Sequence, residues 1–328
     1  MASKDIARRT KTLGRSIPVV VDDAGVRYDA SVLGPGVAMH DGVYCASCRV
    51  PATSVVPHPH TGANGRRAVL AGYFRIKHKG DQHKPECAFD FDRQLRRIVL
   101  DAGPAIITAE RGLYRLHLPL DEPPDPPART SRSAGFAADD VRWAVLSTAA
   151  RIQRLLAGYE RSPEAAEMFV AEYHGRQISW GDFCWDVTRP DQAAELVAEL
   201  RRPDWGQLRY PIAAWTWNAS RPKRNSTNSH RLTLTLAQDG GVVARLRADD
   251  HAVFAGLDPL HTCVMGYGDW RVRPVEGRSD PELELRVGHG SAVTSWPTEV
   301  WPPRAWMHRE RRERPAADVA ARTRGLDN

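Results

Sequence analysis

CASC at residues 45–48 and HKPEC at residues 83–87 are the two stretches that decide how the N-terminal part of this chain folds. Together they supply three cysteines and a histidine: Cys45, Cys48, His83 and Cys87. Two residues separate the first pair and three separate the second, which is the spacing of the two halves of a closed tetrahedral zinc site. The sequence therefore predicts one structural Zn²⁺ ion whose four protein ligands leave no position for a reactive water.

Two alternatives to this ligand set stay open. His78 competes with His83, but its spacing to Cys87 is loose, whereas the i, i+4 spacing of His83 and Cys87 is typical of a second half-site. Alternatively, Cys45 and Cys48 are a redox-active or buried thiol pair without a metal. No βαβ pattern surrounds them, as a thioredoxin-like motif requires, so the pattern favours zinc.

The zinc motifs and the aromatic segment between them resemble a known bacterial module. The aromatic segment is YFRI at residues 73–76. Together with the two ligand motifs, it makes residues 38–95 resemble the N-terminal zinc-binding module of the competence protein CoiA and related bacterial proteins. That module has an early CxxC, an aromatic-rich strand and a closing cysteine. Tyr73 and Ile76 stand where CoiA itself has histidines. The resemblance implies a bacterial protein and a context of DNA uptake, but the Asp…Glu-x-Lys run of a restriction-type nuclease domain has no convincing counterpart here.

Composition indicates a folded, cytoplasmic protein with an anionic partner. The 328 residues, 42% of them hydrophobic and ten of them tryptophan, suffice for two or three domains. The sequence shows no secretory signal and no apolar stretch of about 18 residues, so we expect no membrane partner. Cys184 and Cys263 stand singly and are expected to be core residues in a reducing compartment. The formal charge of +6 and the pI near 9.2 favour an anionic partner.

We expect an α+β multidomain protein. The proline-rich run DEPPDPP at residues 121–127 is too rigid for a helix or an inner strand and indicates a linker. The predicted parts are a zinc-tied β domain at 1–120, the linker at 121–135, a helical segment at 136–205, a five-stranded OB-like β-barrel at 206–303 and a basic flexible tail at 304–328.

Hydrophobic periodicity predicts the elements within these parts. Before the linker, we expect a hairpin over 19–28 and strands at 95–100, 105–109 and 113–118. After it, we expect helices over 138–159, from 162, and over 189–200, with the aromatic run 177–185 packed in the core. The C-terminal part is predicted to contain strands at 210–218, 231–237, 241–247, 262–268, 270–273, 283–287 and 293–296, with a short helix at 249–256. A strand, a long loop, a hairpin, a short helix and two strands is the order of an OB-fold.

The basic segment 221–231 connects the first two strands of the expected barrel, beside the usual ligand groove of an OB-fold. Its cations Arg221, Lys223, Arg224 and Arg231 are predicted to contact phosphates. The predicted base-stacking side chains are Trp215, Trp217 and Trp270. Core packing of these tryptophans is the alternative. The sequence thus predicts a zinc-containing nucleic-acid-binding protein, with single-stranded DNA favoured over RNA.

Two other function classes stay open. No P-loop, GxSxG or HExxH motif occurs, so the sequence favours a binding protein over an enzyme. A metal-dependent nuclease of DNA uptake or phage defence, built on Glu172, Asp182 and Asp186, is the first alternative. A protein-interaction scaffold with a protein partner is the second.

Overall fold

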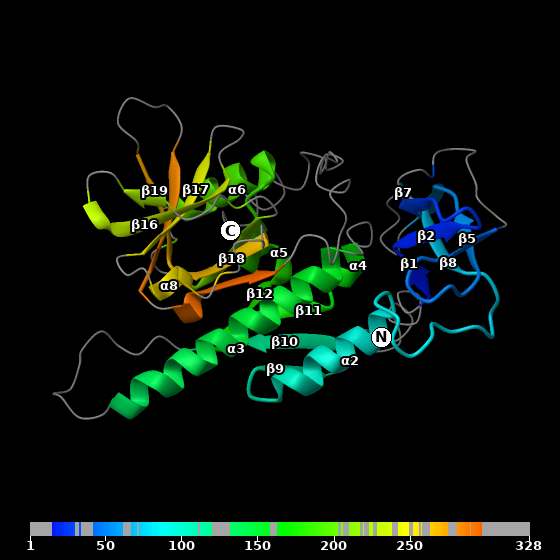
Figure 1. Cartoon of the computed structure of the whole chain (residues 1–328), viewed down its shortest axis with the longest axis horizontal. Helices are drawn as coiled ribbons and strands as arrows, with labels where there is room; N and C mark the ends of the chain where they lie inside the picture. The colour runs from blue at the N-terminus through cyan, green and yellow to red at the C-terminus, as the bar shows by residue number, and fades with distance from the viewer. Residues whose placement is uncertain are drawn as a thin grey trace, which may run out of the picture.

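The computed structural model is mixed α+β and consists mostly of strands (Figure 1). It describes residues 15–29, 33, 42–61, 67–70, 72–110, 112–119, 132–157, 163–202, 205, 210–216, 219, 223–225, 228–237, 242–248, 252–255, 257, 263–274, 281–288 and 290–296. Two hydrophobic cores divide these residues, the first reaching from Ile17 to Phe89 and the second from Phe91 to Trp296. The first unit therefore ends near residue 90, and the described remainder of the predicted 1–120 domain belongs to the second core.

The first unit contains eight short strands among the described residues. They are β1 (Ser16–Ile17), β2 (Val19–Asp22), β3 (Arg27–Asp29), β4 (Val43–Cys45), β5 (Ala52–Val55), β6 (His58–Thr61), β7 (Arg67–Leu70) and β8 (Tyr73–Ile76). Three sheets result, in the orders β3-β2-β4, β1-β8-β5 and β6-β7. The antiparallel pair β2 and β3 confirms the predicted hairpin.

The strand predicted at residues 95–100 is wrong, because these residues lie within helix α2 (Phe91–Ala102). Asp90 caps the helix, since its side chain accepts a hydrogen bond from the Arg93 amide at 3.1 Å. The buried residues Phe91, Leu95 and Ile98 recur at a spacing of four and three, which is the period of a helix face. The apolar run was thus correctly located but assigned the wrong period.

A fourth sheet joins residues from both sides of the predicted linker. Its order is β12-β11-β10-β9, built from β9 (Ile107–Glu110), β10 (Leu113–His117), β11 (Phe169–Tyr173) and β12 (Arg176–Ser179). The central pair β10 and β11 is parallel. The linker residues 121–131 lie outside the described residues. Because β11 and β12 fall within 136–205, the prediction of a helical segment there is wrong in part.

Helices in this part of the chain match the sequence prediction more closely. They are α3 (Arg132–Ala157), α4 (Pro163–Ala166), α5 (Trp180–Phe183) and α6 (Pro190–Leu200). Figure 1 shows α2 and α3 side by side along the second unit. Trp180, Phe183 and Trp185 are buried, which confirms the predicted core packing of the 177–185 run. Among the described residues, no helix combines the length and apolar character needed to cross a bilayer.

The C-terminal strands form two further sheets. The strands are β13 (Cys184–Asp186), β14 (Ile212–Thr216), β15 (Lys223–Asn225), β16 (Asn228–Ala237), β17 (Val243–Ala248), β18 (Cys263–Gly268), β19 (Trp270–Arg273), β20 (Glu282–Val287) and β21 (Val293–Trp296), with α8 (Ala252–Ala255) and the 3₁₀ turn η2 (Gly290–Ala292). Their orders are β13-β14-β18-β21 and β15-β16-β17-β20-β19. The two sheets pack closely, because a Cβ at Gly266 would lie 2.6 Å from Cδ2 of Leu246. The predicted strands are confirmed, but the described residues form no single closed barrel.

Candidate metal centre

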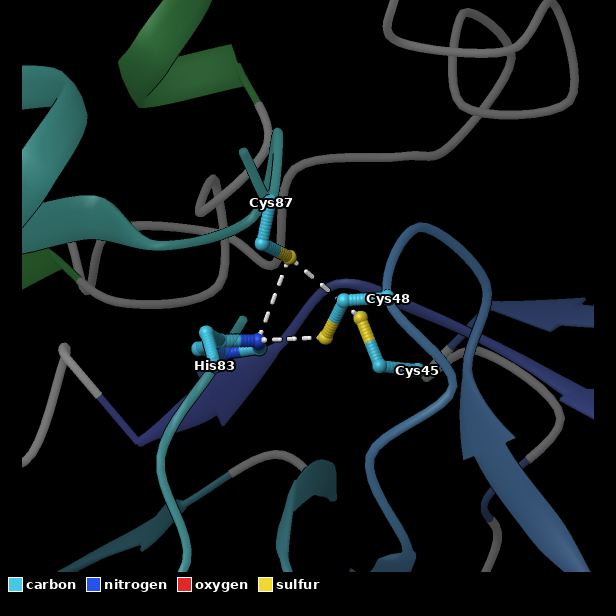
Figure 2. Close-up of side chains that lie close together, drawn as sticks. All are labelled: Cys45, Cys48, His83 and Cys87. Carbon is cyan, nitrogen blue, oxygen red and sulfur yellow. Dashed lines mark hydrogen bonds between the residues drawn. The ribbon is translucent and has the colours of Figure 1, made fainter. Parts of the chain in front are cut away.

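The first half of the candidate site is a tight turn at the end of β4. The Cys45 amide donates a hydrogen bond to the Val50 carbonyl, and the Arg49 amide donates one back to the Cys45 carbonyl, both at 2.9 Å. Arg49 has a φ of 62°, a left-handed conformation that lets the chain reverse within so few residues. This reversal brings the side chains of Cys45 and Cys48 to the same point (Figure 2).

The second half is the segment that enters α2. The Cys87 amide donates to the Lys84 carbonyl at 3.1 Å, which forms the turn that carries His83 and Cys87. The side-chain amide of Gln94, in α2, donates to the Cys87 carbonyl at 3.3 Å. The two halves are joined directly, because the hydroxyl of Ser47 accepts a hydrogen bond from the Ala88 amide at 3.0 Å.

The four ligand atoms are buried and lie within 4.8 Å of one another. Cys45 Sγ is 3.7 Å from Cys87 Sγ, and the Nδ1 atom of His83 is 3.4 Å from Cys48 Sγ and 3.2 Å from Cys87 Sγ. A zinc tetrahedron with Zn–S of about 2.3 Å and Zn–N of about 2.0 Å has S···S and S···N edges of roughly 3.8 and 3.5 Å. The cluster is therefore compatible with one zinc ion.

Electrostatics in the cluster favour a thiolate at Cys87. The pKa of Cys87 is lowered to about 3, chiefly by a hydrogen bond with Cys45. Hydrogen bonds with His83 and Phe89 lower it further, whereas burial opposes the shift. The hydrogen bond between Cys45 and Cys87 raises the pKa of Cys45. Burial lowers the pKa of His83, but hydrogen bonds with Cys87 and Cys48 outweigh it and raise that pKa to about 9. A divalent cation can bind such a site by displacing the protons of the thiols and of the imidazole.

The cluster decides between the ligand alternatives. His83 belongs to it, whereas His78 is exposed and lies outside it. Cys184 and Cys263 are buried elsewhere as free thiols, which confirms the prediction that they are core residues. Arg15 is a supporting residue that sequence reasoning missed. Its guanidinium donates to the carbonyls of His78 and Lys79, both at 2.8 Å, and so fixes the segment leading to His83.

Two of the three predicted stacking side chains, Trp215 and Trp270, are buried. Trp215 and Trp270 have exposed fractions of 1% and 2%, so the prediction that they stack bases is wrong. Both indoles pack in the second core: Trp270 shares a face with its partner Leu285, which faces the four-stranded sheet, and the ring of Trp215 lies 6.3 Å from that of Trp296. Trp217 and Arg221 lie outside the described residues. Lys223 and Arg224 lie in β15 and Arg231 lies in β16, so the predicted loop is largely an antiparallel strand pair.

Glu172, Asp182 and Asp186, the carboxylates of the nuclease alternative, do not form a metal-binding group among the described residues. The cluster found there consists of Cys45, Cys48, His83 and Cys87. Asp182 accepts a hydrogen bond from the Ser179 hydroxyl at 2.7 Å at the start of α5. Glu172 lies 3.9 Å from Nδ1 of His117 on the neighbouring strand. Asp186 is buried at the end of β13.

The buried carboxyl of Asp186 is expected to make the free energy of unfolding depend on pH. Burial raises the pKa of its carboxyl from about 3.8 to about 6, although hydrogen bonds from Thr188 oppose the shift. The folded chain therefore binds this proton more tightly than the unfolded chain, and the stabilisation present below pH 4 is lost as the pH rises to about 6. Relative to Asp186→Asn, the free energy of unfolding should fall by about 3 kcal/mol over this interval. Urea denaturation from pH 4 to pH 7 measures it, and parallel curves for the two proteins would contradict it.

Comparison of the chain with protein-family models gives no match, and comparison with curated proteins gives no significant match. The site must therefore be interpreted from its own residues. What the described geometry offers is a closed set of four soft ligands, and a closed set suits a structural ion rather than catalysis.

Proposed function

We propose that this chain is a zinc-containing nucleic-acid-binding protein in which the ion is structural. The four-ligand cluster supports the zinc assignment. We also propose that the first unit is related to the CoiA zinc module, on the basis of its sequence motifs. The observation that carries the binding proposal is the strand order of the five-stranded sheet, since it is the order expected of an OB-like domain, and basic residues lie in the strands that flank its first connection.

Two pairings support the OB-like assignment. An OB-fold is a five-stranded, partly open Greek-key barrel. If β14 and β15 are successive parts of a first strand, and β18 and β19 of a fourth, the strands follow the order one-two-three-five-four. The parallel pair β17 and β20 then joins strands three and five. The antiparallel pair β14 and β18 joins strands one and four, where such a barrel closes.

The proposed contact is the basic segment 221–231, with Arg221, Lys223, Arg224 and Arg231 on phosphates. In an OB-fold, the loop between the first two strands and the face of strands two and three form the binding surface, and this segment contains the parts of β15 and β16 beside that loop. Binding through phosphates depends steeply on salt, because each neutralised phosphate releases counterions. We propose single-stranded DNA as the preferred ligand.

The triple substitution Arg221→Ala, Lys223→Ala and Arg224→Ala is expected to weaken binding and to reduce the slope of log K against log salt by about 2, at about 0.7 for each lost contact with a single strand. Fluorescence anisotropy with labelled oligo-dT, oligo-U and duplex DNA measures both quantities. A matched control removes three exposed arginines of α2, Arg93, Arg96 and Arg97, and should leave both unchanged.

Three results would overturn or redirect the proposal. Absence of binding at low salt by folded, zinc-loaded protein would reject it and leave the protein-interaction scaffold. Equal losses in the triple variant and the α2 control would reject the segment as the contact. Cleavage of the DNA with added Mg²⁺, abolished by Glu172→Gln or Asp182→Asn, would establish the nuclease alternative.

A further inference from the structure

The five-stranded sheet carries a second set of cations, on the side opposite its hydrophobic core. Side chains alternate between the two faces of a strand. On β17, β19 and β20 the buried positions include Leu246, Trp270 and Leu285, which pack in the second core. The alternate positions carry five arginines, which we call the arginine face: Arg245, Arg247, Arg271, Arg273 and Arg286.

Two buried glutamates of β20 hold four of the five arginines of this face in place. Glu282 and Glu284 are 3% and 1% exposed. Glu282 is ion-paired with Arg245 at 2.7 Å and with Arg247. Glu284 lies 2.8 Å from Arg247, 2.9 Å from Arg273 and 3.2 Å from Arg286. Each carboxylate thus orients at least two guanidinium groups, and these groups are fixed before any ligand binds.

The arginine face retains positive charge after these pairings. Among the described residues, five guanidinium groups stand against three carboxylates, Glu282, Glu284 and Asp269, of which Asp269 lies 3.1 Å from Arg271. The excess is two positive charges. The side chains of Arg271 and Arg286 are 62% and 57% exposed, so both are accessible to a ligand from solvent.

We infer that the arginine face binds the phosphodiester backbone of a nucleic acid. This inference rests on the proposed function and adds a second contact surface to it. A guanidinium group presents a planar fork of donors that matches phosphate, and a preoriented group loses less freedom on binding. Trp270, on the other side of the sheet, is buried and cannot stack on a base. The arginines are therefore expected to contact phosphates and not bases.

The register of the sheet links the arginine face to the basic segment. Lys223 of β15 pairs with Thr233 of β16, and Thr233 pairs with Arg247 of β17. These three residues therefore stand in one line across three neighbouring strands. By its backbone register, position 223 of the basic segment is therefore in line with Arg247 of the arginine face.

The test combines Arg271→Ala with Arg286→Ala, because Glu284 keeps Arg247 and Arg273 after this change. Binding of labelled oligo-dT at 0.1 M salt is expected to weaken roughly tenfold, and the salt slope to fall by about 1.4. The charge-conserving pair Arg271→Lys and Arg286→Lys should keep most of the slope. Arg93→Ala with Arg97→Ala, on α2, removes the same charge elsewhere and should change neither quantity.

The outcomes separate this inference from the proposed function. If the wild-type protein binds oligo-dT and the 221–231 variant is weakened, but the Arg271 and Arg286 variant has the wild-type affinity and slope, the arginine face is not a contact and the proposed function stands. If the wild-type protein binds no nucleic acid, both fail. Circular dichroism of each variant establishes that a lost affinity does not come from unfolding.

Discussion

Replacing Cys87 by serine is expected to reduce bound zinc from one ion per chain to none and to unfold the first unit, residues 17–89. The ion would connect a turn after β4 to the segment before α2, two parts of the chain with few other direct links such as the Ser47 to Ala88 hydrogen bond. The first core is small, with few large side chains besides Phe74 and Phe89. Structural zinc sites contribute on the order of 10 kcal/mol to folding. This contribution exceeds the free energy of unfolding expected for a core of this size, so loss of the ion should unfold the unit.

Zinc content by mass spectrometry and amide hydrogen exchange together check this expectation. Cys184→Ser is the matched control, because it alters a buried thiol of the second unit and should keep one zinc per chain. Exchange should accelerate across residues 17–89 and stay slow in the second core, since the two cores are separate. One zinc per chain in Cys87→Ser, or wild-type protection of the first unit without zinc, would contradict the structural role.

The zinc cluster could be predicted from sequence because its chemistry is local. Two ligand pairs with short spacings define two turns, and only their meeting is a long-range event. The choice of His83 over His78 also followed from local spacing. In contrast, Arg15 lies 61 to 64 residues away from the carbonyls that it binds, so no local pattern indicates its role.

The errors have long-range causes as well. The parallel pairing of β10 with β11 depends on strands separated by the 26-residue helix α3, and sequence gives no sign of it. Trp215 was predicted to stack on bases, with core packing as the alternative, because strand alternation does not say which face is outside; both faces of β14 are buried between other elements. The arginine face, however, has a local signal. Its strands read VARLRA, WRVR and ELELRV, in which charged and apolar residues alternate with the period of a strand.

Replacing Glu284 by glutamine is expected to lower the free energy of unfolding of the second unit by about 3–5 kcal/mol. The side chain keeps its size, so no cavity forms, but the charge that faces Arg247, Arg273 and Arg286 is lost. Glu284 is 1% exposed, and removing one partner from a buried ionic network leaves the others with their desolvation cost uncompensated. The backbone pairing of β20 with β17 and β19 is unaffected by the change.

Urea denaturation, followed by fluorescence of the buried tryptophans, measures the loss. Glu199→Gln is the control, because its ion pair with Arg202 is largely exposed and should contribute less than about 1 kcal/mol. The difference between the two variants should persist at 0.5 M salt, since buried pairs are screened less than exposed ones. A loss below 1 kcal/mol for Glu284→Gln would mean that the arginines do not depend on this carboxylate for their position. The arginine face would then lose its preorganisation, and its phosphate contacts would have to be attributed to mobile side chains that order only on binding.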